Sequence, residues 1–234
     1  MRSTGKAAVA FQQTAWTYGR SLFDDLLGRY AAFYDLTELP APAPIIGELL
    51  TQFLGVGYYI DPLPDDRFAQ THTEDGRVII TVNSLTGLIP GVKDVRGVQN
   101  VAAFHEGIHV VRNRDLLTPL EHDRLPGLAA PVMICYRSGP SRDKRYSTVE
   151  HFAEEAGRAA AIPVWALERS RPYQEFVRRG AERSDGHVPD GWKYLYPVSE
   201  ELGVNITALV KQLQFENRLV IDPERQLFVP WRLF

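Results

Sequence analysis

The stretch FHEGIHVV, residues 104–111, carries two histidines four positions apart and a glutamate directly after the first. On an α-helix, His105 and His109 lie one turn apart and point the same way. Two imidazoles at this spacing can bind one metal ion, and Glu106 lies close enough to take a proton from a water molecule beside it. The stretch therefore predicts a metal site on a helix.

The same stretch carries a second pattern. Phe104, Ile108 and Val111 follow one another at helical spacing and form an apolar stripe, which we expect to be buried in the core. The helix, predicted over about 98–112, thus has one face for anchoring and one for chemistry. A chance match to the metal motif is the alternative, but such a match would more often fall in a polar region without a stripe of its own.

A third metal ligand must come from elsewhere, because catalytic zinc usually takes three protein ligands and leaves one position for water. Asp115 is one candidate, since it occupies the place of the last ligand in a longer form of the motif. That form needs a turn after the second histidine, and Arg112 stands where its glycine should be. Asp115 is therefore the weaker candidate.

Glu150 is the better candidate for the third ligand. It opens EHFAEEA, a predicted helix with Glu150, Ala153, Glu154 and Gly157 on one face. The small residues would let this helix pack closely on the motif helix and bring Glu150 to the metal. Glu154, one turn further on, is then predicted to hydrogen-bond a ligand histidine from the second shell. The alternative for this helix is a solvated acidic face.

Elsewhere the periodicities predict an α+β protein in which helices dominate. Residues 169–191 are polar, contain Gly and Pro, and are expected to form a connection. Gly203 marks a turn between two C-terminal helices, with Asn205 as the N-cap of the second. Further helices are expected over 14–36, after Pro44 as far as Gly55, and from Thr148 to before Pro163, and strands over 56–60, 77–85 and 131–137.

Composition narrows the class of protein. The net charge of −3 argues against a protein that coats nucleic acid. No apolar run approaches the roughly 18 residues that a membrane span needs, and the N-terminal stretch is too weak for a secretory signal. The single cysteine, Cys135, has no partner for an internal disulfide. We therefore expect a cytoplasmic protein without a membrane partner.

Three segments together resemble the ImmA/IrrE-type metallopeptidases. They are FHEGIHVV, the strand ending in ICYR (134–137), and EHFAEEAGRAAAIP (150–163). The family typically opens with a helix and a short helix after a proline-rich stretch, here residues 39–57, and continues with a strand ending in Val-Asn, here VIITVN (78–83). A helix-turn-helix-like segment often follows, here residues 196–220. The likeness runs from about residue 20 to 222.

The resemblance implies a mostly helical, zincin-like peptidase core with a small β-sheet. We assign this core to residues 1–168, a connecting segment to 169–191, and a helix-turn-helix-like segment to 192–234. Carried over residue by residue, the family pattern makes three side chains the zinc ligands and Glu106 the catalytic base. The three ligands are His105, His109 and Glu150. Manganese is the alternative metal.

Members of this family cleave repressors of the helix-turn-helix type and so switch on genes of mobile elements or stress responses. The resemblance therefore implies a zinc-dependent endopeptidase whose partner is such a repressor. The alternative is a regulatory protein-binding module with a vestigial or structural metal site, which a fourth ligand such as Cys135 would favour. The C-terminal helices carry few basic residues, Lys211 and Arg218, so we expect them to contact the core or a protein rather than DNA.

The sequence departs from the family pattern in three places. Gly107-Ile108 reverses the usual order before the second histidine, so Ile108 is expected to crowd the neighbouring strand. Residues 160–162 are Ala-Ala-Ile rather than larger aliphatic residues, which predicts a looser or differently filled core. The stretch between His109 and Glu150 is long, and 115–147 is expected to form a lid or a partner-binding loop. Within it, the basic loop 137–145 is interpreted as solvated.

Overall fold

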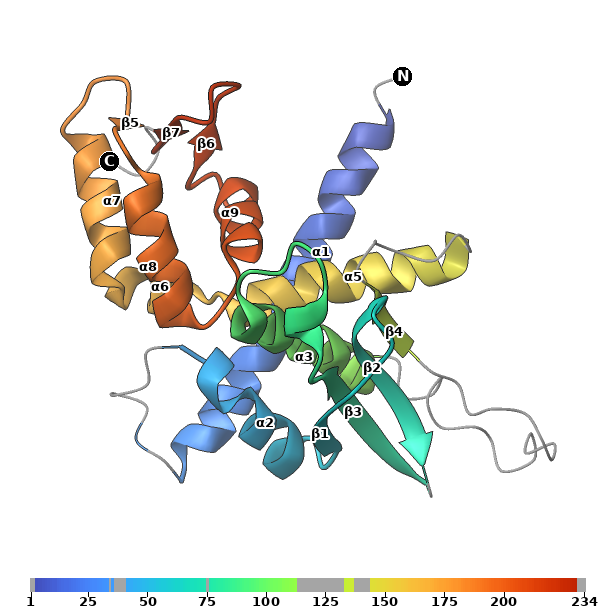
Figure 1. The fold of residues 1–234 in the computed structure, drawn as a ribbon. Coiled ribbons are helices and arrows are strands. Elements are labelled where there is room, and N and C mark those ends of the chain that lie inside the picture. The colour runs from blue at the N-terminus through green and yellow to red at the C-terminus, as the bar shows by residue number, and fades with distance from the viewer. Residues whose placement is uncertain are drawn as a thin grey trace.

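A computed structural model describes residues 3–33, 35, 41–74, 76–112, 133–136 and 144–230 of the chain, which has a mixed α+β fold. The labels are those of Figure 1. The helices are α1 (Ser3–Ala31), η1 (Ala43–Ile45), α2 (Ile46–Glu48), η2 (Leu49–Phe53), η3 (Thr86–Leu88), α3 (Val95–Arg112), α5 (Lys144–Ala161), α6 (Val164–Arg169), α7 (Arg171–Ala181), α8 (Trp192–Leu202) and α9 (Ile206–Phe215). The strands are β1 (Gly57–Asp61), β2 (Arg67–Glu74), β3 (Arg77–Asn83), β4 (Met133–Tyr136), β5 (His187–Val188), β6 (Val220–Ile221) and β7 (Leu227–Phe228).

The larger sheet has the strand order β1-β3-β2-β4. Strand β1 runs parallel to β3, whereas β2 runs antiparallel to both β3 and β4. Ala69 and Thr71 of β2 lie opposite Val82 and Ile80 of β3, and all four side chains are buried. Because side chains alternate between the two faces of a strand, these residues form one face of the sheet, and α3 packs on it.

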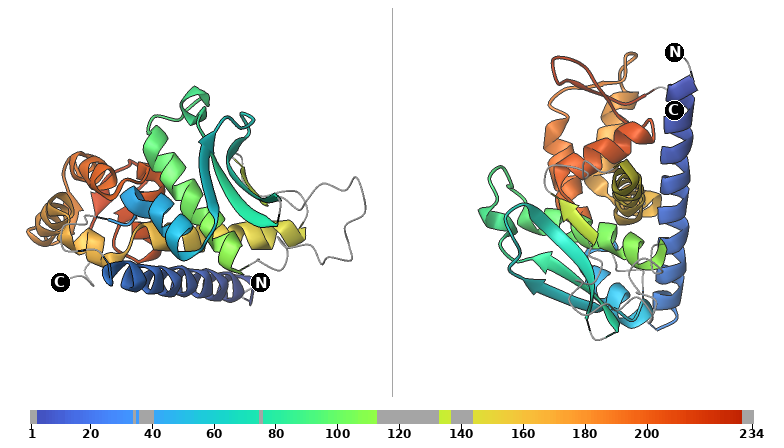
Figure 2. Two further views of the ribbon diagram at one scale, coloured as in Figure 1. Left: turned by 90° about the horizontal axis from the view of Figure 1, so that it is seen from below. Right: turned by 90° about the vertical axis from the view of Figure 1, so that its right-hand side faces the viewer.

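Helix α3 lies between this sheet and α5, and α1 runs along the far side of α5 (Figure 2). The two contacts of α5 depend on glycine. A Cβ atom on Gly157 of α5 would lie 2.8 Å from the backbone nitrogen of His105, and one on Gly19 of α1 would lie 2.0 Å from the carbonyl oxygen of Ala156. Helices can approach this closely only where a side chain is missing. The small residues therefore determine how near α5 comes to the metal motif, as the sequence predicted.

The stripe on α3 anchors it as expected, with Phe104 and Ile108 buried and Val111 half-buried. Ile108 packs against Ala15, Phe152, Ala153 and Ala156, which belong to α1 and α5. The expected crowding of a strand by Ile108 is thus wrong, because this face of α3 points away from the sheet. The residues at 160–162 are buried in the main core, and the expectation that this core is looser or differently filled stays a prediction.

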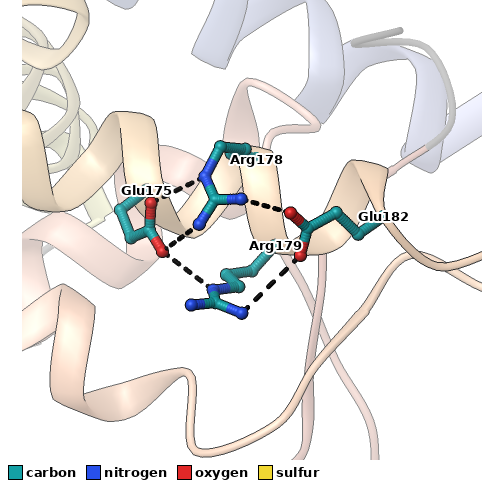
Figure 3. A network of polar contacts seen from close by, with 4 residues as sticks. All are labelled: Glu175, Arg178, Arg179 and Glu182. Carbon is teal, nitrogen blue, oxygen red and sulfur yellow. Dashed lines mark hydrogen bonds and ion pairs between the residues drawn. The ribbon is translucent and has the colours of Figure 1, made fainter.

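The segment predicted to be a connection, residues 169–191, contains helix α7 and strand β5 instead. Helix α7 packs against α8, and its exposed face carries a network of Glu175, Arg178, Arg179 and Glu182 (Figure 3). The sequence was misleading because these charges mask a strongly amphipathic helix with Tyr173 and Phe176 buried on its other face. One hydrophobic cluster contains residues from Phe23 to Val229, on both sides of the boundaries at 168 and 192, which stay a prediction.

The C-terminal part, residues 171–229, follows the order α7, β5, α8, α9, β6, β7. Its three short strands form a second sheet in the order β5-β7-β6, with antiparallel pairing throughout. The predicted turn between α8 and α9 is confirmed: Gly203 adopts a left-handed conformation with φ of 64°, and the side chain of Asn205 accepts a hydrogen bond from the Ala208 amide. The turn also contacts the core, because Asn100 of α3 donates a hydrogen bond to the carbonyl oxygen of Gly203 at 2.8 Å.

Candidate metal centre

Three side chains converge where α3 crosses α5. The Nε2 atom of His105 lies 3.0 Å from Nε2 of His109 and 3.0 Å from Oε2 of Glu150, and His109 Nε2 lies 3.3 Å from Oε1 of Glu150. All three side chains are buried. The two histidines are one turn apart on α3, and α5 supplies the carboxylate across the close contact at Gly157. His105, His109 and Glu150 can therefore hold a metal ion together.

The donor set and its spacing fit a small divalent ion. In a tetrahedral site with metal–ligand distances of about 2.1 Å, neighbouring donor atoms lie roughly 3.4 Å apart. The observed separations of 3.0 and 3.3 Å are close to this value, so the ring nitrogens and the carboxylate need little rearrangement to bind one ion. Two imidazoles and one carboxylate also suit zinc, which accepts both nitrogen and oxygen ligands.

The electrostatics of the cluster favour a cation. Burial alone would raise the pKa of Glu150, but its hydrogen bonds to His105 and His109 lower it to about 2, so the carboxyl group is ionised. Burial alone would lower the pKa of His105, but the hydrogen bond to Glu150 and the nearby carboxylates raise it. The cluster thus concentrates negative charge next to imidazole nitrogens, which attracts a positive ion.

Glu106 lies beside this cluster and is fully buried. Its Oε2 atom accepts a hydrogen bond of 2.5 Å from the hydroxyl of Thr71, while Oε1 has no hydrogen-bond partner among the described residues. Burial raises the pKa of the Glu106 carboxyl group against the opposing effect of the two histidines. A carboxyl group whose pKa is raised in this way binds a proton more readily than an exposed one, as a proton acceptor must.

Glu154 does not take the place that the sequence predicted. Its carboxylate lies 3.1 Å from the amine of Lys211 in α9 and 3.8 Å from the guanidinium of Arg158, and it is not hydrogen-bonded to a ligand histidine. The reason lies in the packing of α9 on α5, which brings Lys211 to the Glu154 carboxylate. The predicted second-shell hydrogen bond is therefore replaced by a contact between two parts of the molecule.

Several sequence-based candidates lie outside the described residues. They include Asp115, the alternative third ligand, and most of both the loop 137–145 and the expected lid 115–147. The backbone of Cys135 forms part of β4, in agreement with the predicted strand. Among the side chains that the structure describes, the one candidate group of metal ligands is His105, His109 and Glu150.

Thr71 is a site residue that the sequence did not reveal. It precedes Glu106 by 35 positions, and its strand, β2, was not predicted because FAQTHTE contains few apolar residues. Only the pairing of β2 with β3 brings Thr71 onto the face that α3 covers. An alternation of threonines, at positions 71 and 73, was the one available signal for a strand.

Comparison of the chain with models of protein families and with curated proteins gave no match. Among the described residues, none of the helices, α1 with its 29 residues included, has the apolar composition that a bilayer crossing requires. The function is therefore inferred from the geometry of the site.

Proposed function

We propose that this protein is a zinc-dependent endopeptidase that resembles the ImmA/IrrE type. The observation that carries the proposal is the convergence of three buried ligand atoms beside a buried carboxylate, Glu106. His105, His109 and Glu150 would hold the metal. A bound zinc ion would polarise the scissile carbonyl and lower the pKa of the attacking water molecule.

Glu106 would act as the general base and then as the general acid. Its carboxylate would take a proton from the attacking water and pass it to the leaving amine. The two oxygens of Glu106 suit this role. Oε2 is held by a hydrogen bond, whereas Oε1 has no hydrogen-bond partner among the described residues and is available for the proton. The packing of α3 between the larger sheet and α5 supports the proposal of the zincin-like core that the resemblance implies.

The proposed substrate is a helix-turn-helix repressor, whose cleavage would switch on gene expression in a mobile element or a stress response. We expect both proteins to act in the cytoplasm, since the single cysteine leaves no internal disulfide to form. All four site residues are buried, which supports a narrow substrate range, because a partner must use binding energy to bring its scissile bond into such a site. Unfolded casein is therefore expected to be cleaved only weakly.

The helix pair α8–α9 would contact protein rather than bind DNA. Lys211 of α9 is engaged by Glu154 of α5, and Trp16 of α1 packs against Phe215 at the end of α9. Helix α9 is thus held by two helices of the core, and its one basic residue, Lys211, already has an acidic partner. This supports the expectation that direct DNA binding is absent.

The test uses the full-length protein loaded with one equivalent of zinc and incubated with helix-turn-helix regulators encoded beside its gene. Mass spectrometry should find one or a few cuts in one regulator. The variant Glu106→Gln should keep its zinc content and slow cleavage by about 10² to 10⁴-fold, because glutamine is similar in size but cannot take the proton. Equal cleavage by Glu106→Gln would refute the mechanism. Tight regulator binding without any cleavage would instead favour the regulatory binding module.

A further inference from the structure

Glu106 is held from the sheet, by a residue outside the metal motif. Thr71 lies in the middle of β2, opposite Ile80 of β3, and its side chain is fully buried against α3. Its hydroxyl donates to Oε2 of Glu106 at 2.5 Å. Thr71 is a β-branched residue in a paired strand, so both its backbone and its χ1 angle are restricted, and its hydroxyl is a rigid donor.

The two oxygens of Glu106 have different surroundings. Oε2 is bound to Thr71, whereas Oε1 is buried and has no hydrogen-bond partner among the described residues. Without the hydroxyl, both oxygens would be buried without a partner, and a carboxylate rarely stays in such a position. It would turn toward another partner, and the imidazoles of His105 and His109 are close enough to act on its charge.

We propose that Thr71 is a positioning residue that fixes the Glu106 carboxylate so that Oε1 receives the proton of the attacking water. The inference rests on the proposed peptidase function for this last step, but the positioning itself can be observed without any substrate. Among the described residues, the Thr71 hydroxyl is hydrogen-bonded to Glu106 and to none of the three ligands, so in this scheme it acts through Glu106. It also couples the base to the sheet, because any shift of β2 relative to α3 changes the hydrogen bond directly.

A purely structural role for Thr71 makes a different prediction. If the threonine served only to fill space, Thr71→Val would be neutral, since valine has the same shape without the hydroxyl. If the hydroxyl positions Glu106, then Thr71→Val should impair the site and Thr71→Ser, which keeps the hydroxyl, should rescue it. Thr71→Ala is the second variant, to be used if the valine protein does not fold.

The first measurement is crystallographic and independent of activity. Crystals of the wild type, Thr71→Val and Thr71→Ser are grown with zinc, and the Glu106 side chain is compared. We expect the same Glu106 rotamer in the wild type and in Thr71→Ser, and a different rotamer in Thr71→Val. The three ligands, His105, His109 and Glu150, should keep their positions in all three proteins. An unchanged Glu106 carboxylate in Thr71→Val would overturn the proposal.

The second measurement uses fluorescein-labelled casein as a general probe. We expect Thr71→Val to lower kcat by about 10 to 100-fold with little change in KM, since the carboxylate is misplaced but the binding surface is intact. Thr71→Ser should recover most of the rate. The double variant Thr71→Val/Glu106→Gln should cleave no more slowly than Glu106→Gln alone. Wild-type rates in Thr71→Val would overturn the catalytic part. If the wild type cuts neither casein nor any helix-turn-helix regulator encoded beside its gene, while the crystals of Thr71→Val show a displaced Glu106, the peptidase function fails and the positioning stands.

Discussion

The protein holds carboxylates with little exposure at two places, and the charge of these carboxylates is balanced differently at each. Glu216, which follows α9, contacts Arg20 of α1 at 2.7 Å and Arg218 at 2.9 Å, and Trp16 and Gln212 donate further hydrogen bonds to it. At the candidate metal centre, Glu106 and Glu150 are surrounded by histidines and a threonine. Among the described side chains, neither carboxylate there has an Arg or Lys partner.

We interpret this difference as separating a structural cluster from a candidate ligand site. The arginines at Glu216 are permanent cations, so the cluster is complete and joins α1 to the C-terminal part. The donors at the candidate metal centre converge without an Arg or Lys partner among the described residues, so this group could hold a positive ion. Buried acidic groups whose charge is not balanced by the protein itself are thus the better indicator of a ligand site.

The largest effect is expected when the three candidate metal ligands are removed one at a time. His105→Ala, His109→Ala and Glu150→Ala should each lose nearly all zinc, because two remaining ligands seldom retain the metal. Zinc content is measured by mass spectrometry after dialysis. His151→Ala is the matched control, since His151 neighbours Glu150 but is exposed, and it should keep about one zinc per chain. Full zinc in Glu150→Ala would mean that Glu150 is not a ligand.

The second prediction breaks the structural cluster instead. Glu216→Gln leaves Arg20 and Arg218 facing a neutral amide in a mostly buried site, and should lower the free energy of unfolding by about 2 to 4 kcal/mol. Urea denaturation measures this change, and zinc content should be unaltered. Glu175→Gln, in the exposed network of α7, is the control and should change stability little, because water already solvates those groups. Equal effects in both variants would contradict the distinction between the clusters.

The third prediction concerns the close contact that builds the metal centre. Gly157→Ala places a Cβ atom 2.8 Å from the His105 backbone nitrogen, so α5 must move away from α3 and Glu150 with it. We expect a loss of about 1 to 3 kcal/mol in stability, as for other overpacked sites, together with weaker zinc binding. Gly28→Ala in α1 is the control. A Cβ atom there meets nothing within 4 Å, so alanine should stabilise the helix by about 0.5 to 1 kcal/mol. Unchanged zinc affinity in Gly157→Ala would show that the helix spacing is not critical.

The smallest effect is expected at the contact between α5 and α9. The Lys211–Glu154 pair is about half exposed, so Lys211→Ala should change the free energy of unfolding by less than about 1 kcal/mol. Glu154→Gln should leave zinc affinity within a few-fold of the wild type. Isothermal titration with zinc measures this. A loss of about tenfold or more in Glu154→Gln would restore the second-shell role that the sequence predicted.

The sequence by itself determined the local parts of the candidate site. The spacing of His105 and His109, the apolar stripe on α3, the Gly203 turn and the Asn205 cap all depend on residues within a few positions of one another, and each is confirmed. Even the long-range choice of Glu150 followed from local information, because the small residues beside it on α5 indicated a close helix contact.

Only the tertiary structure decided which distant side chains meet. Strand β2 carries too few apolar residues to be recognised, and its Thr71 reaches Glu106 only through pairing with β3. The partner of Glu154 depended on where α9 packs, and the charges of α7 hid a helix whose buried face is seen only against α8. The strands β5, β6 and β7 have two residues each, too few for a periodic pattern. The spacing of apolar residues along the sequence indicates the type of one helix or strand and which of its faces is buried. Contacts between helices and strands depend instead on how the whole chain packs.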